Sequence, residues 1–288
     1  MDWLAAVDRL RRDRMPGVLV TLVSVRGHSP RAAGAKMVVA PDAAYGSIGG
    51  GNLEATAVDR ARDLIARGER SPEHLELALN ERATVEHGQQ CCGGEVSVLL
   101  EPLAVAPSVA IFGVGHVGLE LARILARQDL ELHLVDSRRD QLDPDRLQVL
   151  AGAVARVQVH HAPVPELVLG QVPPGTHVLI MTHDHAEDAA LCDGALRCQH
   201  LGSVGLIGSS AKWRRFQKRL AAEGHSREMV ASIRTPIGLP EITGKEPAVI
   251  AVSVAADLLR TFQAEAPRAA PATQQSIRTT ARRESARR

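Results

Sequence analysis

The sequence predicts an α/β protein that has a C-terminal Rossmann-like parallel sheet and a smaller N-terminal α+β domain. Three observations predict this class. A Gly-x-Gly-x-x-Gly motif at residues 113–118 follows an apolar run and opens a helical one. Strand-like and helix-like segments alternate after it, which is typical of right-handed βαβ units. A proline-bearing segment at residues 102–107 separates this alternation from the more mixed pattern before it.

The N-terminal elements follow from hydrophobic periodicity and from the residues that end each run. Leu4, Val7 and Leu10 share one face of an expected first helix, which ends before Pro16. The later elements are expected as strands at residues 18–25, 36–40 and 44–48, a helix at 53–67, and strands around 75–79 and 95–100. We assign these elements to a first domain at residues 1–104.

The C-terminal elements follow from the alternation itself. Strands are expected at residues 108–112, 130–135, 154–159, 177–181 and 202–207, and helices at 116–127, 187–197, 211–223 and 247–262. We assign them to a second domain at residues 105–262. From Gln263 the chain is rich in Ala, Pro, Gln, Ser, Thr and Arg without periodicity, so we expect a disordered tail at residues 263–288.

Composition excludes several function classes. Apolar residues make up 45% of the 288 residues, the net charge is +1 and aromatic residues are only 2%. The small charge and the scarcity of stacking side chains argue against binding to nucleic acid or to a membrane surface. No apolar run approaches the roughly 18 residues of a membrane helix, and the N-terminus lacks the features of a secretory signal. We therefore expect a cytoplasmic protein with reduced cysteines.

The glycine motif has the context that a dinucleotide-binding fingerprint requires. Gly113 would permit the tight turn, Gly115 would let the backbone approach a phosphate, and Gly118 would let the helix pack on the strand. His116 begins the helix whose amides would hold the phosphate. Asp136 ends the next strand, where it would accept hydrogen bonds from a ribose diol. NAD(P) and a phosphorylated pterin both suit this site, and a scaffold that binds no ligand also remains open.

A second motif places Cys91, Cys92 and Gly93 in a polar, glycine-flanked loop. Adjacent cysteines seldom form a disulfide and lack the spacing of a zinc site. A thiolate there suits a soft metal or sulfur transfer, and simple burial of one cysteine is the alternative. Cys192 and Cys198 are interpreted as packing residues.

Further candidate residues lie in loops that precede helices. Gly49, Gly50 and Gly51 form a potential anion nest, and the planar guanidinium group of Arg31 could bind a phosphate through two hydrogen bonds. In the C-terminal half, the candidates follow expected strands, where ligands bind in such sheets: His183, His185, Gly208 and Ser209. Each motif alone also fits an ordinary turn, a surface arginine or the edge of a cleft.

Taken in order, these segments resemble the XdhC/CoxI family of molybdenum hydroxylase accessory proteins. The similarity covers about residues 18–259 and is carried by residues 26–37, 46–54, 88–94, 112–118, 181–185, 205–212, 235–239 and 250–256. The sequence departs from the family pattern at His28, at the second glutamine before Cys91, and in residues 240–244.

The resemblance implies a maturation factor rather than a turnover enzyme. Its cargo would be the molybdenum cofactor (molybdopterin). The protein would stabilise this cofactor, support its sulfuration and insert it into xanthine dehydrogenase. Apo-xanthine dehydrogenase and a cysteine desulfurase would be its partners, and a homodimer is left open. Cys92 is the first candidate for a molybdenum contact, and Cys91 is the second. The main alternative is an NAD(P)-dependent oxidoreductase, and a third is a scaffold that bridges hydroxylase and desulfurase.

Overall fold

The computed structural model describes residues 1–78 and 94–265 of the chain. The described residues form two compact units, Met1–Ala104 and Val105–Glu265. Each unit has its own five-stranded sheet and its own core. The cysteine loop with Cys91, Cys92 and Gly93 lies outside the described residues, as does the chain after Glu265.

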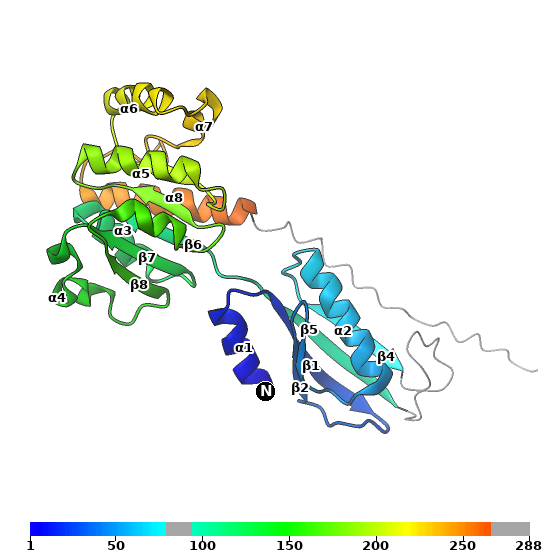
Figure 1. Ribbon diagram of the computed structural model, residues 1–288. Helices are drawn as coiled ribbons and strands as arrows, with labels where there is room; N and C mark the ends of the chain where they lie inside the picture. Colours follow the sequence, from blue (N-terminus) through cyan, green and yellow to red (C-terminus); the bar gives the residue numbers. More distant parts are fainter. Residues whose placement is uncertain (79–93, 266–288) are drawn as a thin grey trace, which may run out of the picture. The chain divides into compact units, whose positions relative to one another are not determined.

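The first unit is an antiparallel sheet with the strand order β3-β2-β1-β5-β4 (Figure 1). Its elements are α1 (Trp3–Arg12), β1 (Gly17–Arg26), β2 (Lys36–Val39), β3 (Ala44–Gly46), α2 (Gly51–Ala66), β4 (Glu73–Ala78) and β5 (Glu95–Leu103). Apolar residues at every second strand position face α2, which contributes Leu53, Ala57, Ala61 and Leu64 to the core. On the other sheet face, Ala6 and Leu10 of α1 pack against Val38 and Ala40. The sheet therefore carries a helix on each face.

The second unit is a parallel sheet with the order β10-β9-β6-β7-β8. Its strands are β6 (Ser108–Phe112), β7 (Glu131–Asp136), β8 (Arg156–His161), β9 (His177–Ile180) and β10 (Val204–Leu206). Its α-helices are α3 (His116–Leu125), α4 (Pro144–Leu147), α5 (His185–Arg197), α6 (Ser210–Ala222), α7 (Arg227–Ser232) and α8 (Pro247–Glu265). The order reverses between β6 and β9, and ligands bind at such a switch point in open α/β sheets.

Helices cover both faces of this sheet, as the predicted Rossmann-like class requires. Residues of α3 and α8 pack on one face, and residues of α5, α6 and α7 belong to the core on the other. Figure 1 shows α6 and α7 lying beyond α5. The α/β prediction is confirmed: an antiparallel N-terminal sheet is followed by a parallel C-terminal one.

Three local features differ from the sequence prediction. The short helices α4 and α7 were not expected, because four and six residues are too few for helical periodicity to appear. Residues 263–265, expected to begin a disordered tail, instead complete α8. The side chain of Phe262 packs near the His177 ring, and Glu265 lies 3.2 Å from His177 Nε2, so the last turn is tied to β9.

Among the described helices, α8 is long and apolar enough to cross a membrane if judged by length and composition alone. In the structure it packs against α3 and contributes Ala251, Val254, Ala255 and Leu258 to the core. One face of the helix therefore belongs to the core of the second unit, while 28% of its apolar stretch is buried.

Candidate functional site

The β6–α3 turn assigns a separate role to each motif glycine. Gly113 has φ +101°, and a Cβ there would lie 2.4 Å from the Met181 carbonyl oxygen, so only glycine fits beside the end of β9. A Cβ on Gly118 would lie 2.1 Å from the Gly113 carbonyl oxygen, so this glycine lets α3 approach β6. By contrast, no atom of the described residues lies within 4 Å of a Cβ built on Gly115. The backbone at Gly115 therefore faces open space.

The amide end of α3 is available beside this open space. Gly115 is the N-cap residue, and no described side chain caps the helix. The first N–H groups of a helix lack intrahelical acceptors and carry the positive end of its dipole. His116, the first helical residue, is exposed. This end of α3 can hold a phosphate oxygen, as the motif predicted.

Asp136 is already hydrogen-bonded by the protein. Its carboxylate accepts from the Val114 amide at 2.7 Å, and from the Arg138 amide, Nε and Nη2 at 2.9, 3.0 and 3.0 Å. The residue is only 2% exposed. Burial alone would raise the pKa of Asp136, but the hydrogen bonds from Arg138 and Val114 outweigh burial and hold it below its usual range. Asp136 therefore fixes the glycine turn, and its predicted contact with a ribose diol stays a prediction.

A second arginine holds the same turn from the other side. Arg146 Nη1 donates to the Val114 carbonyl oxygen and to the Gln141 carbonyl oxygen, both at 2.6 Å. Val114 is thus bound through its amide by Asp136 and through its carbonyl by Arg146. The turn is therefore held at both its amide and its carbonyl group.

The loops after β9 and β10 are joined by a buried ion pair. Lys212 Nζ lies 2.5 Å from Asp188 Oδ2 and donates to the Ile207 carbonyl oxygen at 3.0 Å. Asp188 Oδ1 accepts from the Thr182 amide at 3.1 Å and from its hydroxyl at 2.8 Å. Asp188 and Lys212 are 1% and 8% exposed. The pair links the loop that carries His183 to the loop that carries Gly208 and Ser209.

The predicted residues of these two loops lie at the same end of the sheet as the glycine turn. His183, on the loop that follows Met181, and His185, the first residue of α5, are both exposed, and Gly113 lies against Met181 and Thr182. Gly208 gives room to the Lys212 stem, since a Cβ there would lie 2.8 Å from Lys212 Cδ. Ser209 caps α6 by accepting from the Lys212 amide. The structure gives Gly208 and Ser209 local structural tasks, and their contact with a ligand stays a prediction.

In the first unit, the predicted anion nest already holds a carboxylate of the chain. Gly49, Gly50 and Gly51 have φ values of +138°, +73° and +61°. Glu54 Oε2 accepts from the Gly50 amide at 3.0 Å, from the Ile48 amide at 3.2 Å and from the Ser47 hydroxyl at 2.6 Å. Backbone donors in such a nest favour anions. The prediction of an anion nest therefore has a geometric basis, and Glu54 is the anion in this structure.

Arg31 and the glycine triplet lie close together. A Cβ on Gly49 would lie 3.2 Å from Pro30 Cβ and 3.7 Å from Arg31 Cγ. Gly94, the first described residue after the cysteine loop, packs on the same segment, since its Cβ would lie 2.4 Å from the His28 carbonyl oxygen. One end of the first unit thus joins the Arg31 loop, the glycine triplet and the base of the cysteine loop.

We expect Glu54→Ala to destabilise the first unit by about 1–2 kcal/mol, because it leaves the Gly50 and Ile48 amides without their acceptor. Glu54→Gln keeps a side-chain oxygen and should lose clearly less. Urea unfolding of both variants, followed by circular dichroism, measures the difference. Equal stability of wild type and Glu54→Ala would contradict this role of Glu54.

The two described cysteines fit the packing role that was predicted for them. Cys192 is buried, and burial together with the Asp188 carboxylate raises the pKa of its thiol to about 12. Cys198 is partly buried against the same core. Within residues 1–78 and 94–265, no group of three or more His, Cys, Asp or Glu side chains is placed to bind a metal. The predicted thiolate role of Cys91 and Cys92 lies outside the described residues and stays a prediction.

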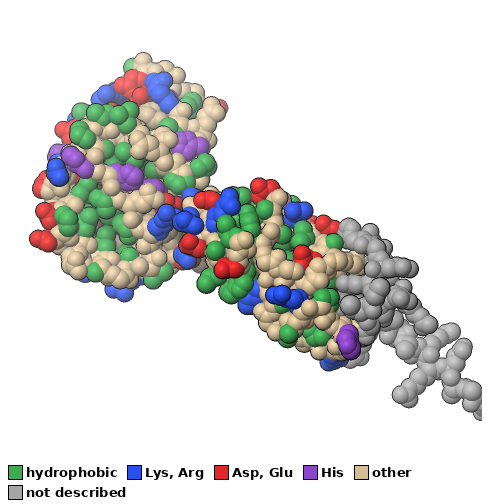
Figure 2. Space-filling model, turned by 60° about the horizontal axis from the view of Figure 1, so that its bottom comes forward, with side chains coloured by type: hydrophobic (Ala, Val, Ile, Leu, Met, Phe, Trp, Pro, Cys, Tyr) green, Lys and Arg blue, Asp and Glu red, His purple; other side chains and the backbone are tan. Residues whose placement is uncertain are grey.

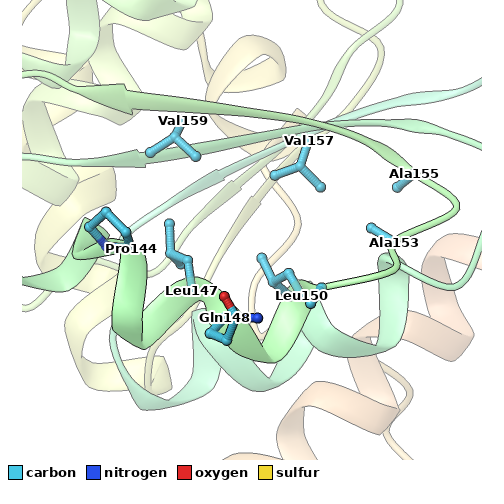
Figure 3. Close-up of a pocket in the computed structure, with 9 residues that line it drawn as sticks. Pro144, Leu147, Gln148, Leu150, Ala153, Ala155, Val157 and Val159 are labelled. Carbon is cyan, nitrogen blue, oxygen red and sulfur yellow. The ribbon is translucent and has the colours of Figure 1, made fainter.

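A separate crevice of about 310 Å³ lies under the edge strand β8. Figure 3 shows Leu147 and Leu150 of the helical segment pointing toward Val157 and Val159 of the strand. Figure 2 shows hydrophobic side chains, with histidine side chains among them, on the visible face of the second unit. The walls of the crevice are mostly apolar, so it supplies few donors to a phosphate and is distinct from the glycine turn.

Sequence reasoning missed most of the contacts that fix the loops. Arg138, two residues after Asp136, and Glu54, in the first turn after the glycine triplet, have short-range signals in their spacing. Arg146 and the Asp188–Lys212 pair have none, because their partners lie on other elements. Residues that act across loops are found only when the fold is known.

Comparisons with known proteins complete the description. A family model described as "XdhC Rossmann domain" matches residues 109–258, more than half of the chain, and one described as "XdhC and CoxI family" matches residues 10–76. A curated relative, "Uncharacterized protein YqeB" from Escherichia coli K12, is 28% identical over 262 residues, which cover 90% of this chain and 46% of that protein. The chain thus spans about half the length of that relative.

Two solved structures are also similar. One, titled as a xanthine dehydrogenase from Bacillus halodurans, has a TM-score of 0.47 and 20% identity, and the match covers 94% of this chain and 98% of that chain. The other is the E. coli tRNA N6-threonylcarbamoyladenosine dehydratase TcdA in complex with ATP. It has a TM-score of 0.42 and 16% identity, and the match covers 56% of this chain and 87% of that chain.

Proposed function

The chain belongs to the XdhC and CoxI family, and from this premise we propose that it is a chaperone of the molybdenum cofactor. The cofactor is cargo: the protein binds it, stabilises it, supports its sulfuration by a cysteine desulfurase and inserts it into apo-xanthine dehydrogenase. Delivery of this kind is proposed to take place in the cytoplasm.

One observation carries the proposal: the open, rigid phosphate cradle at Gly115. The turn is fixed through Val114 by Asp136 and Arg146, while a Cβ on Gly115 would meet no described atom within 4 Å. A preformed turn loses little conformational freedom when it binds a ligand. Helix amides of α3 suit the phosphate that molybdopterin carries. The residues present therefore fit the phosphorylated end of the cargo.

The cysteine loop is proposed to supply a contact to molybdenum. Thiolates are soft ligands, and Cys92, with Cys91 as the second choice, supplies the thiolate. Arg31 and the glycine triplet adjoin the base of the same loop, as the packing of Gly94 on His28 supports. A loosely held thiolate contact suits a carrier, because the cargo has to be released.

Of the alternative, an NAD(P)-dependent oxidoreductase, the NAD-dependent form has weaker support, because it needs contact with an unmodified ribose diol. An NAD-binding turn presents an acidic side chain to the ribose diol. Here the Asp136 carboxylate accepts four hydrogen bonds from the protein, which use about all of its acceptor positions. Binding a diol would require Arg138 or Val114 to release the carboxylate.

The test is the molybdenum and pterin content of protein purified without oxygen from a cofactor-producing host. We expect near-stoichiometric cofactor in the wild type. In Cys92→Ala the cofactor content should fall at least about tenfold, because the loss of a contact at a metal site lowers the affinity by about that factor. Cys198→Ala is the matched control, because it removes a thiol from a helix end outside the cysteine loop. Its cofactor content should equal that of the wild type.

Wild-type protein without molybdenum or pterin would reject the chaperone proposal and favour the nicotinamide or scaffold alternatives. Full cofactor content in Cys92→Ala would reject only the role of the cysteine. Unfolding midpoints of the three proteins, measured in parallel, separate lost binding from lost folding.

A further inference from the structure

The side chains of Asp136 and Arg138 form a fixed ion pair beside the glycine turn. Arg138 binds the carboxylate in a fork, through Nε to Oδ1 and Nη2 to Oδ2, and its own amide donates to Oδ1. Paired hydrogen bonds of this kind hold a guanidinium in one orientation. The arginine is thus positioned before any ligand arrives.

This ion pair presents the Arg138 guanidinium at the position where a ribose-binding carboxylate is expected. Asp136 is 2% exposed, whereas the Arg138 side chain is 30% exposed. None of the described residues accepts a hydrogen bond from Arg138 Nη1, so this nitrogen is available to a ligand. Two acidic groups, Asp140 and Glu187, are close enough to act on Arg138, and Glu187 accepts from the Ser137 hydroxyl at 2.7 Å. These carboxylates leave the guanidinium nitrogen itself unbound.

The arginine also lies close to the amide end of α3. Val114 N and Arg138 Nη2 bind the same carboxylate oxygen, at 2.7 and 3.0 Å. The guanidinium therefore borders the turn that leads into Gly115. Helix amides and one arginine nitrogen together suit a phosphate monoester, which has three acceptor oxygens and nearly two negative charges at neutral pH.

We infer that Arg138 makes this site select a phosphate monoester over an unmodified ribose diol. The inference concerns the cradle of the proposed function and rests on it for the presence of a phosphorylated ligand. Asp136 acts as a positioning residue, since it holds Arg138 and the turn and does not contact the ligand. The monoester could come from the pterin or from the 2′-phosphate of a dinucleotide, and the chemistry is shared.

Two matched ligand pairs test the inference and identify the source. NADPH and NADH differ by a 2′-phosphate, and 6-hydroxymethylpterin phosphate and 6-hydroxymethylpterin differ by a phosphate monoester. Titration calorimetry should show at least a tenfold preference for the phosphorylated member of one pair. Arg138→Gln should abolish that preference, and Arg123→Gln, which removes an exposed cation of α3 paired with Glu120, should keep it.

The double variant Asp136→Asn/Arg138→Gln guards against misfolding, because it replaces the ion pair by two neutral amides. It should also lose the preference, and a fluorescence-monitored unfolding curve checks that it is folded at the temperature of the titration. The inference is overturned if neither pair shows a preference, if none of the four ligands binds, or if Arg138→Gln keeps the preference. Cofactor content is measured separately, so cofactor in a protein without this preference rejects the inference and leaves the chaperone proposal intact.

Discussion

Gly118→Ala is expected to destabilise the second unit by about 3 kcal/mol, the upper end of the usual cost of overpacking a core. The added Cβ would lie 2.1 Å from the Gly113 carbonyl oxygen and 3.3 Å from Ile111 Cγ2. The nearest of these atoms is backbone, so it cannot rotate away as a side chain can. Helix α3 would have to move off β6, and the gain of about 1 kcal/mol from alanine in a helix offsets only part of this cost.

Gly115→Ala is the matched control, three residues away in the same motif. Its Cβ would meet no atom of the described residues within 4 Å, and its backbone, with φ −69° and ψ −157°, lies at the edge of the extended region that alanine adopts. We expect a loss of stability below about 1 kcal/mol, the cost of alanine at an N-cap position. Cofactor content should nevertheless fall, because the methyl group occupies the cradle.

Urea unfolding and cofactor content, measured on both variants, give opposite expected patterns. Gly118→Ala should be unstable, and Gly115→Ala should be stable and empty. A Gly115→Ala protein that retains full cofactor would show that the turn does not hold the cargo. A Gly118→Ala protein as stable as the wild type would mean that α3 packs differently on β6.

Lys212→Met is expected to cost about 3–5 kcal/mol, because it leaves a buried carboxylate without its cation. Asp188 is 1% exposed and would retain only the hydrogen bonds from Thr182. Methionine has nearly the length of lysine and can fill the space beside Gly208 and Phe216. The loss therefore reports the charge more than the packing.

Two further variants test whether the stability lost in Lys212→Met comes from the unpaired buried charge. Asp188→Asn/Lys212→Met removes both charges and keeps an oxygen for Thr182, so it should recover much of the stability lost in Lys212→Met. Arg197→Met breaks the Arg197–Asp193 pair on the exposed side of the same helix and should cost below about 1 kcal/mol. If Lys212→Met proves as mild as Arg197→Met in thermal unfolding, the buried pair does not hold the two loops together.

The sequence predicted the parts of the site that depend on neighbours along the chain. The roles of Gly113, Gly115 and Gly118 depend on a strand–turn–helix context that is readable from the motif, and the structure shows the tight turn, the open space and the close packing that were expected. The order of strands and helices was likewise readable, because burial on both faces leaves long apolar runs.

The remaining parts depend on which side chains meet across loops. Asp136 was correctly placed at the end of β7, but its occupation by Arg138 and Val114 depends on rotamers that the sequence does not specify. Glu54 was not recognised as the acceptor of the glycine triplet for the same reason. Cys92 lies outside the described residues, so its role stays a prediction.

The position of α8 in the second unit has a consequence for biosynthesis. Its residues Ala251, Val254, Ala255 and Leu258 complete a core that includes Val109 and Ile111, made far earlier by the ribosome. The core of the first unit, which extends from Val18 to Leu100, is complete long before this. During translation the first unit can therefore fold while one face of the parallel sheet still lacks its cover. Helix α3, which begins at the glycine turn, packs against α8, so this packing can form only after residues 247–265 have been made.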